Sequence, residues 1–309
     1  VSLVCLPAEA ELMNKEGARI RLPVKGRKDL VEIDTRKLKG KLRAGGPTNF
    51  NPKDFDLIGL AMQEPQYRQP GVRELLDAVA KSRVPTMSIM NMPPLPYVKR
   101  IPGLDYAKLE VAYTDPRVWD SFDPATLTLC SPDPQAFRPP EEPVNVLQVT
   151  LPTNFKAARF DPGDGTKVEL PVKLKTHESI FVPLAKWAML LTGNYRCVTK
   201  DGPRAIKDAV HSDIEASRSV YNWVKDLCVG LGADANDLVP FEKYAAAAQG
   251  LSRPSSAARA LFAGAPYIER VDRLVQAIAK QKGLSNPVVD ATVKLVDEKL
   301  EANRAAQKK

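Results

Sequence analysis

The sequence predicts an α/β domain with an open sheet, followed by an all-helical domain. In the first half, short apolar runs alternate with helical patterns, which is typical of parallel strands covered on both faces. After roughly residue 170, helical spacing replaces this alternation. The length of 309 residues exceeds what one hydrophobic core usually serves. We therefore predict domains at 1–168 and 169–309.

The first half contains short elements separated by turn residues. We expect strands over 1–6, 18–22, 28–33, 56–62, 85–90, 144–150 and 155–160, and helices over 8–15 and 70–82. The strands at 18–22 and 28–33 are predicted to pair as a hairpin. The series from 56 to 90 has the order strand, helix, strand, which indicates a right-handed crossover unit.

The stretch 93–143 is rich in proline, which breaks regular elements. It still contains aromatic residues such as Trp119, so we expect an ordered insertion that covers a cleft. In the second half we expect helices over 172–191 with a break at Pro183, and over 204–230, 240–249, 255–263, 268–282 and 287–302.

Composition excludes several classes of protein. Hydrophobic residues make up 44% and charged residues 27%, as in folded globular proteins. No apolar run approaches the roughly 20 residues of a membrane span, and no signal-peptide pattern opens the chain. The four cysteines lie far apart, which favours free thiols in a reducing compartment, so we expect a cytoplasmic protein.

The net charge of +8 does not predict nucleic-acid binding, because basic residues are interspersed with acidic ones. A modest positive field suits a phosphate-bearing cofactor or a carboxylate substrate. The two histidines lie far apart and no cysteines are paired, so no metal site is predicted.

One glycine-rich segment invites a nucleotide-binding interpretation. Gly230-Leu-Gly-Ala-Asp-Ala235 matches the loose pattern G-x-G-x-x-A. A dinucleotide fingerprint needs a strand before it, whereas an amphipathic helix precedes this segment. We therefore predict a glycine helix cap.

Several segments resemble one enzyme family. They are Val1–Pro7, Asn14–Pro23, Asp56–Met62, Ser88–Met92, Pro254–Pro266 and Gly283–Asp290. In amino-acid sequence and in their order along the chain, these segments resemble the ketopantoate reductase family. In that family a Rossmann-type domain precedes a helical domain like that of 6-phosphogluconate dehydrogenase. The resemblance implies an NADP- or NAD-dependent reductase of a 2-keto acid or related carbonyl, and a homodimer as a candidate assembly.

The resemblance also shows departures. The family's first strand and G-x-G-x-x-G turn have no counterpart, and we expect them upstream of Val1; the alternative is a protein that lost its phosphate loop. Leu6 stands where the family has an arginine for the 2′-phosphate of NADP, which leaves NADP and NAD both open. Gln63 stands where the family has a lysine. The insertion at 93–143 and the altered motif of the helical domain favour a substrate other than ketopantoate.

The resemblance further implies site residues in the α/β domain. Leu60, Ala61 and Met62 are predicted to contact the cofactor, and Asn91 to contact the nicotinamide and the substrate. Independently of the resemblance, Asn91 follows a buried strand at its carboxyl end, where open α/β sheets place ligands.

In the helical domain the family uses the motif K-x-x-x-N-x-x-x-N. Lys173 takes the place of the lysine that donates a proton to the substrate oxygen, with Lys175 as an alternative. His177 and Phe181 fall on the two asparagines. If this segment is helical, Lys173 and His177 share a face; otherwise they are a solvated lysine and an ordinary histidine.

Two further positions complete the predicted site. Ser256 aligns with the family's serine. The glutamate that holds the substrate hydroxyl falls on Ile268 by ungapped count, and on Glu269 after a one-residue slip. With Arg270 and Asp272 beside it, Glu269 equally suggests a surface charge cluster.

Two alternatives to the reductase stay open. One is a non-catalytic binding or scaffold protein of the same fold. The other is an opine-type dehydrogenase, in which a histidine of the helical domain does the acid–base work; His177 favours it, whereas His211 is expected on a helix surface.

Overall fold

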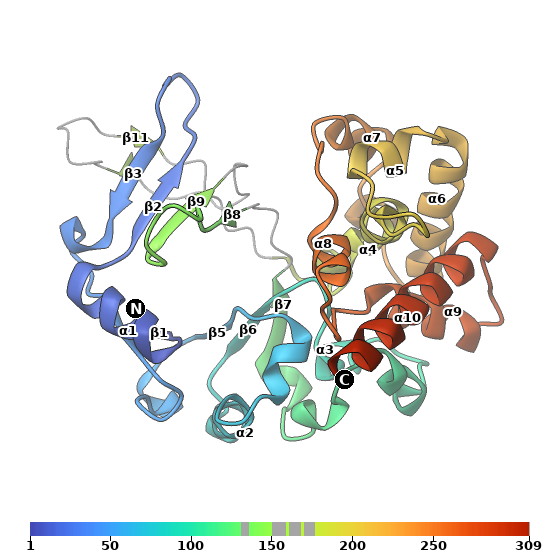
Figure 1. Cartoon of the computed structure of the whole chain (residues 1–309). Helices are drawn as coiled ribbons and strands as arrows, with labels where there is room; N and C mark the ends of the chain where they lie inside the picture. The colour runs from blue at the N-terminus through green and yellow to red at the C-terminus, as the bar shows by residue number, and fades with distance from the viewer. Residues whose placement is uncertain (131–135, 150–158, 161–167, 170–176, 309) are drawn as a thin grey trace. The chain divides into compact units, whose positions relative to one another are not determined.

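The computed structural model describes residues 1–130, 136–149, 159–160, 168–169 and 177–308. The chain divides into two compact units (Figure 1). Unit 1 consists of Val1–Phe55 and Pro132–His177. Unit 2 consists of Asp56–Ser131 and Glu178–Lys309.

Unit 1 is built mainly from strands. Strand β2 (Arg19–Leu22) pairs antiparallel with β3 (Val31–Asp34), which confirms the predicted hairpin, and parallel with β9 (Val146–Val149). The other elements are α1 (Pro7–Glu16), β1 (Ser2–Val4), β4 (Arg43–Gly45), β8 (Ala136–Phe137), β10 (Arg159–Phe160) and β11 (Val168–Glu169). β1 pairs parallel with β4, and β8 extends the β3-β2-β9 sheet.

Unit 2 contains a parallel sheet in the order β5-β6-β7. Helix α2 (Val72–Ser82) connects β5 (Ile58–Leu60) to β6 (Thr86–Ile89), which confirms the predicted crossover unit. The strands β5 and β6 run in the same direction, so the residues that follow them emerge at the same edge of the sheet.

The proline-rich stretch contains regular elements where it is described, and a role for it in covering a cleft stays a prediction. It supplies the third strand of the sheet, β7 (Leu127–Cys130), and the short helix α3 (Leu95–Val98). Tyr97, Ile101 and Trp119 are buried in the main core. Prolines limit the backbone here to short helical turns without removing it from the core.

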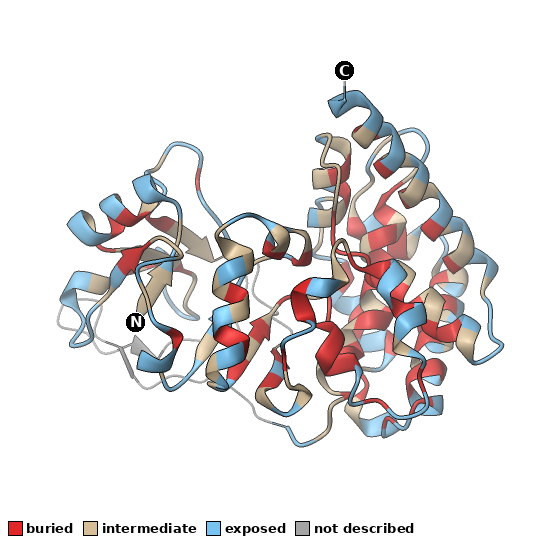
Figure 2. Cartoon of the chain, turned by 90° about the horizontal axis from the view of Figure 1, so that it is seen from below, coloured by how far each residue is buried: buried red, intermediate tan, exposed pale blue. Residues whose placement is uncertain are grey.

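Helices make up the rest of unit 2. They are α4 (Lys186–Met189), a π-helical turn (Leu190–Asn194), α5 (Ile206–His211), α6 (Ile214–Gly230), α7 (Phe241–Ala248), α8 (Ser256–Phe262), α9 (Val271–Gln281) and α10 (Pro287–Gln307). One hydrophobic cluster runs through the sheet and these helices, and Figure 2 shows buried residues throughout them.

Two predicted helices have different limits in the structure. The helix expected over 204–230 is two helices, because the Asp213 side chain accepts a hydrogen bond from the Ala216 N–H and starts α6 anew. In the helix expected over 172–191, residues 172–176 lie outside the described residues, and residues 177–182 are not helical. Pro183 stands at the first position of a 3-10 turn that leads into α4.

The compact units and the predicted domains group the residues differently. The strands β5, β6 and β7 share a core with the helices, although all three lie before residue 168. The ranges 1–168 and 169–309 separate an α/β pattern of elements from a helical one. That they are also the domain boundaries stays a prediction.

Candidate functional site

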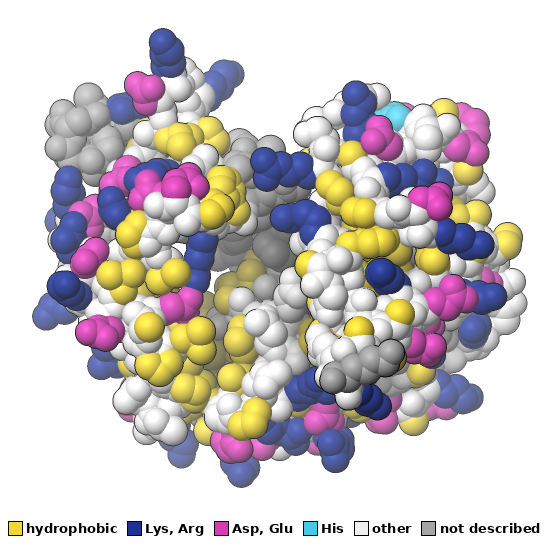
Figure 3. All heavy atoms as spheres, viewed as in Figure 1, with side chains coloured by type: hydrophobic (Ala, Val, Ile, Leu, Met, Phe, Trp, Pro, Cys, Tyr) yellow, Lys and Arg dark blue, Asp and Glu magenta, His cyan; other side chains and the backbone are white. Residues whose placement is uncertain are grey.

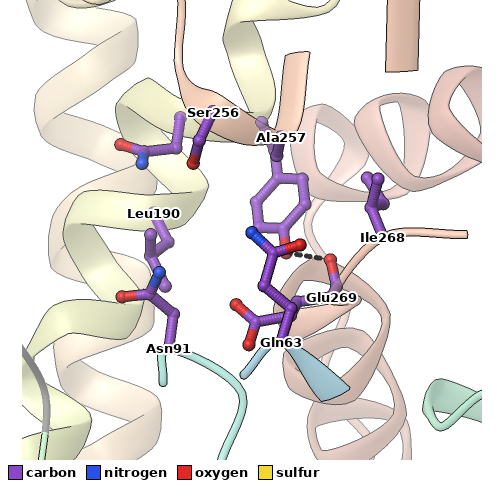
Figure 4. A pocket seen from close by; sticks show the side chains of 9 residues that line it. Gln63, Asn91, Leu190, Ser256, Ala257, Ile268 and Glu269 are labelled. Atoms are coloured by element: carbon purple, nitrogen blue, oxygen red, sulfur yellow. Dashed lines mark hydrogen bonds between the residues drawn. The ribbon is translucent and has the colours of Figure 1, made fainter. Parts of the chain in front are cut away.

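Unit 2 has a cavity at the edge of its sheet where β5 and β6 end. The cavity is small, about 20 Å³. Figure 4 shows side chains from the sheet and from the helical part turned toward each other around it. The lining residues are Gln63, Asn91, Leu190, Asn194, Tyr195, Ser256, Ala257, Ile268 and Glu269.

The side-chain amide of Asn91 has an oxygen atom without a hydrogen-bond partner among the described residues. Asn91 follows β6 by two residues, and this Oδ1 atom is buried. Figure 4 shows the Asn91 side chain beside Leu190. Buried amide oxygens are rarely left unpaired, so Asn91 has an acceptor free for a bound molecule.

Glu269 is the ionisable group of the cavity. Its side chain is buried, and desolvation raises the pKa of this carboxyl to about 7. The nearby Glu64 carboxylate adds to the rise, whereas the backbone N–H groups of Glu64, Asn91 and Met92 act against it. The Oε1 atom has no hydrogen-bond partner among the described residues. Near neutral pH, Glu269 is therefore suited to give or take a proton.

Buried neighbours hold Glu269 in place. The Tyr195 hydroxyl donates a hydrogen bond of 2.6 Å to the backbone carbonyl of Glu269 and accepts one of 3.0 Å from the Val271 N–H. After Glu269, the Arg270 guanidinium makes two hydrogen bonds of 2.9 Å to the Asp272 carboxylate, which is fully buried. The expected surface charge cluster is therefore wrong: these charges lie inside, where they fix the start of α9.

A π-helical turn brings Asn194 to the cavity. The turn follows α4 directly, and π-helical turns often occur at functional sites. Its conformation accommodates Tyr244, whose hydroxyl donates to the carbonyl of Met189 at 3.1 Å. A Cβ atom on Gly193 would lie 2.1 Å from the Tyr244 Oη atom, so only glycine fits this position.

Ser255 links helix α8 to the π-helical turn. Its Oγ atom accepts a hydrogen bond from the Ala258 N–H at 3.1 Å, as an N-cap, and donates one of 2.7 Å to the Asn194 carbonyl. The next residue, Ser256, lines the cavity. This one hydroxyl therefore couples the position of Ser256 to that of Asn194.

Comparisons with known proteins identify the fold. No family model matches the chain, and no curated protein matches it. Among solved structures, 2-dehydropantoate 2-reductase from Methylococcus capsulatus matches with a TM-score of 0.63 and 13% identity, over 98% of this chain and 90% of that chain. A ternary complex of D-mandelate dehydrogenase with NADH and anilino(oxo)acetate matches with a TM-score of 0.59 and 12% identity, over 98% and 91%. This chain has the ketopantoate reductase fold.

Another structure of the same fold is a dimeric ketopantoate reductase from Staphylococcus aureus. It matches with a TM-score of 0.55 and 11% identity, over 98% of this chain and 99% of that chain. The agreement confirms the predicted fold class, a Rossmann-type domain followed by a helical domain. At these identities the likeness concerns the fold alone.

The cavity brings together three of the residues predicted for the site of a ketopantoate reductase fold. Asn91, Ser256 and Glu269 all line it. Ile268 lines it as well, so both candidates for the family's glutamate position are present, and only Glu269 carries a carboxylate.

The remaining predicted residues that the structure describes are not part of the lining. Leu60 ends β5, and Ala61 and Met62 follow it directly before the lining residue Gln63; the backbone N–H and carbonyl of Met62 both bond to the Tyr67 hydroxyl. Lys173 and Lys175 lie outside the described residues. His177 is exposed, non-helical and part of unit 1.

Phe181 and the histidines are likewise away from the lining. Phe181 is buried in the main core of unit 2. The imidazole of His211 lies 3.0 Å from the Ala245 carbonyl and 3.2 Å from the Gln249 amide nitrogen. Neither His177 nor His211 lines the cavity.

The sequence analysis did not single out Leu190, Asn194 or Tyr195. The signal was present, because the motif K-x-x-x-N-x-x-x-N has a second match in Lys186, Leu190 and Asn194, with leucine at the first asparagine position. These residues follow at intervals of four along α4 and the π-helical turn, which is the spacing of one helix face. Leu190 and Asn194 both line the cavity.

A further prediction concerns the glycine-rich segment at the end of α6. Gly230 ends α6 and Gly232 adopts a left-handed φ of +111°, which confirms the glycine helix cap. In the part of the chain that the structure describes, no group of three potential metal ligands is found. Among the same residues, no helix has the length and apolar character that crossing a membrane requires.

Proposed function

We propose that the chain is a nicotinamide-dependent reductase of a 2-keto acid. The observation that carries the proposal is the convergence of Asn91, Asn194, Ser256 and Glu269 on one cavity at the carboxyl ends of parallel strands. In open α/β sheets this edge is where ligands bind. Structures with this fold include 2-dehydropantoate 2-reductase and a D-mandelate dehydrogenase with NADH.

The residues present fit the nicotinamide end of such a cofactor. The unpaired Oδ1 atom of Asn91 provides an acceptor, and Leu60, Ala61 and Met62, at the end of β5 and directly after it, would line its path. When bound, the cofactor supplies the hydride. Because Leu6 replaces the arginine that the family uses for NADP, we propose that NADH is accepted at least as well as NADPH.

For the proton, we assign the lysine of the motif to Lys186. It lies one helical turn before Leu190, on the face whose next two positions line the cavity. An ammonium at this place donates a proton to the substrate's carbonyl oxygen as negative charge develops there. Lys173 remains the alternative assignment.

The other lining residues suggest how the substrate is held. The carboxyl of Glu269 and the hydroxyl of Ser256 would bind the oxygens of the 2-keto acid. Leu190 and Ile268 give the cavity apolar walls, and Leu190 stands where the family has an asparagine. We therefore propose a substrate with an apolar side chain rather than ketopantoate.

Cofactor oxidation tests the proposal. NADH and NADPH are each incubated with 2-keto acids that carry aliphatic, aromatic or hydroxylated side chains, and absorbance of the reduced cofactor is followed. We expect turnover with an apolar member of the set. Lys186→Ala should lower kcat/KM by about 10²- to 10⁴-fold, the usual contribution of a positioned proton donor. Lys173→Ala is the matched control and should leave kcat/KM close to the wild-type value. If Lys173→Ala lowers kcat/KM and Lys186→Ala does not, Lys173 is the proton donor.

The non-catalytic alternative is favoured by one observation. Gln63 and Leu190 stand where the family has polar groups that serve the reaction, so the cavity is less polar than the motif requires. Titration of the intrinsic tryptophan fluorescence with NADH and NADPH separates the two proposals. Absence of binding and of turnover in full-length protein would favour a scaffold.

A homodimer, as in the Staphylococcus aureus structure, stays a proposal to be tested by analytical ultracentrifugation.

A further inference from the structure

A group of cations surrounds one tyrosine on the surface of unit 2. We call Arg68, Tyr267, Arg304 and Lys308 the Tyr267 cluster. The guanidinium carbon of Arg68 lies 3.8 Å from the centroid of the Tyr267 ring, and that of Arg304 lies 5.8 Å from it. Arg304 is also fixed by a hydrogen bond of 3.2 Å from Nη1 to the Pro266 carbonyl. The two guanidinium groups are therefore ordered before any ligand arrives.

The positive charge of the cluster is not balanced locally. Among the described residues, no ion pair involves Arg68, Arg304 or Lys308, and their partners are a ring and a carbonyl. Several other cations nearby are paired: Arg270, the N-cap of α9, and Arg273 with Asp297, and Lys294 of α10 with Glu298.

Two acidic residues, Glu64 and Glu301, lie close to the cluster in sequence. Neither forms an ion pair with it among the described residues, although the charge of Arg68 acts on the Glu64 carboxylate. Glu301 on α10 is exposed and forms no ion pair among the described residues. Glu64 is buried, and its carboxylate accepts hydrogen bonds from the backbone and hydroxyl of Thr114. A hydrogen bond from Arg68, together with the charges of Arg68, Arg304 and Lys308, lowers the pKa of the Tyr267 hydroxyl, as expected where positive charge is in excess.

Two residues of the Tyr267 cluster are close in sequence to residues that line the cavity. Tyr267 directly precedes Ile268 and Glu269, which line the cavity. Arg68 ends the 3-10 turn Glu64–Arg68, which starts directly after the lining residue Gln63. Figure 3 shows Lys and Arg side chains beside the C-terminal end of α10, where Arg304 and Lys308 lie.

We propose that the Tyr267 cluster is a binding site for a phosphate group. Guanidinium groups present planar pairs of N–H donors that match phosphate oxygens, and Arg68 and Arg304 are held by the Tyr267 ring and the Pro266 carbonyl. Three cations without an acidic partner suit a phosphate dianion better than a single carboxylate. The site itself does not depend on the proposed reductase function, whereas the source of the phosphate does.

Calorimetric titration of the full-length protein with inorganic phosphate tests the site. We expect saturable binding that weakens roughly tenfold or more in Arg68→Ala and in Arg304→Ala, because each removes hydrogen bonds to a charged ligand. Lys294→Ala is the matched control, since Lys294 lies on the same helix and is paired with Glu298. It should leave the affinity unchanged. Absence of saturable binding, or equal weakening in the control, overturns the proposal.

Competition distinguishes the sources of the phosphate. If NADH or NADPH displaces inorganic phosphate from the wild type, the site receives a phosphate of the cofactor. If phosphate binds equally well in the presence of either cofactor, and a phosphorylated 2-keto acid displaces it, the site belongs to the substrate. Phosphate binding without reductase turnover would overturn the proposed function alone. Turnover without phosphate binding would overturn the Tyr267 cluster alone.

Discussion

The two units of the chain differ in how their described residues are packed. In unit 2, one hydrophobic cluster includes fully buried side chains such as Trp119, Trp187 and Tyr221. In unit 1, the described hydrophobic cluster consists of Ala10, Met13 and Ala44. The cavity lies in the densely packed unit, where side chains are held in fixed positions. Substitutions in unit 2 should therefore cost more free energy of unfolding than chemically similar ones in unit 1.

The largest difference is expected for acidic partners of arginine. Asp272→Ala removes the fully buried carboxylate that pairs with Arg270 and leaves it only the half-buried Asp297; breaking a buried pair typically costs about 3–5 kcal/mol. Glu32→Ala in unit 1 removes a partly exposed partner of Arg21, which keeps Glu142, so about 0.5 kcal/mol is expected. Urea unfolding of both variants measures the contrast. Equal losses of unfolding free energy in the two variants would show that the buried ion pair of unit 2 stabilises the fold no more than the exposed one of unit 1.

The second prediction concerns Glu269 and pH. Its folded pKa of about 7 exceeds the unfolded value of about 4.3, so the folded state holds the proton more tightly. The folded state is therefore favoured most below about pH 4, and this advantage is lost as the pH rises toward 7. Because glutamine does not titrate, Glu269→Gln should gain stability relative to wild type over this range, by up to about 4 kcal/mol.

Urea unfolding of wild type and Glu269→Gln at several pH values measures this gain. The effect depends on the burial of this carboxyl, so the corresponding substitution of the exposed Glu301 should not show it. A stability difference that stays constant between about pH 4 and pH 8 would contradict the raised pKa.

Much of the fold could be predicted from local sequence. The strands β2, β3, β5 and β6 and the helix α2 follow patterns of hydrophobic residues within a few positions. β7 was hidden in a proline-rich stretch, because its place in the sheet depends on pairing with β6 far earlier in the chain. The sequence predicted one helix over 204–230, whereas the structure has two that meet at Asp213. The N-cap residue Asp213 is a weak signal, because the apolar residues keep their helical spacing on both sides of it.

The site was predictable where its residues stand at strand ends or in short motifs. Asn91 was found by both routes, and Ser256 and Glu269 by resemblance. The motif fits only in part in both registers: His177 and Phe181 replace both asparagines after Lys173, and Leu190 replaces one of the two after Lys186. Spacing alone does not distinguish the two lysines. Asn194 reaches the cavity through a π-helical turn that depends on Tyr244, a contact about fifty residues away in sequence.

A third prediction tests this π-helical turn. Gly193→Ala places a methyl group against the Tyr244 hydroxyl, and overpacking of this kind costs about 1–3 kcal/mol. Gly40→Ala in unit 1 is the matched control, since a Cβ there meets nothing within 4 Å and its φ is not left-handed. Thermal unfolding should show a loss for the first variant and little change for the second. A Gly193→Ala protein as stable as wild type would mean that the tyrosine moves without cost.

The smallest predicted effect concerns the two N-caps. Ser255→Ala removes the cap of α8 together with the bond to the Asn194 carbonyl, and about 1 kcal/mol of stability should be lost. Asn51→Ala, which removes the cap of an exposed 3-10 turn in unit 1, should cost less. Because Ser255 also positions Ser256 and Asn194, its loss should raise KM for the keto acid, whereas Asn51→Ala should leave KM unchanged. If KM stays constant in Ser255→Ala while stability falls, the hydroxyl supports the helix alone and the cavity keeps its shape without it.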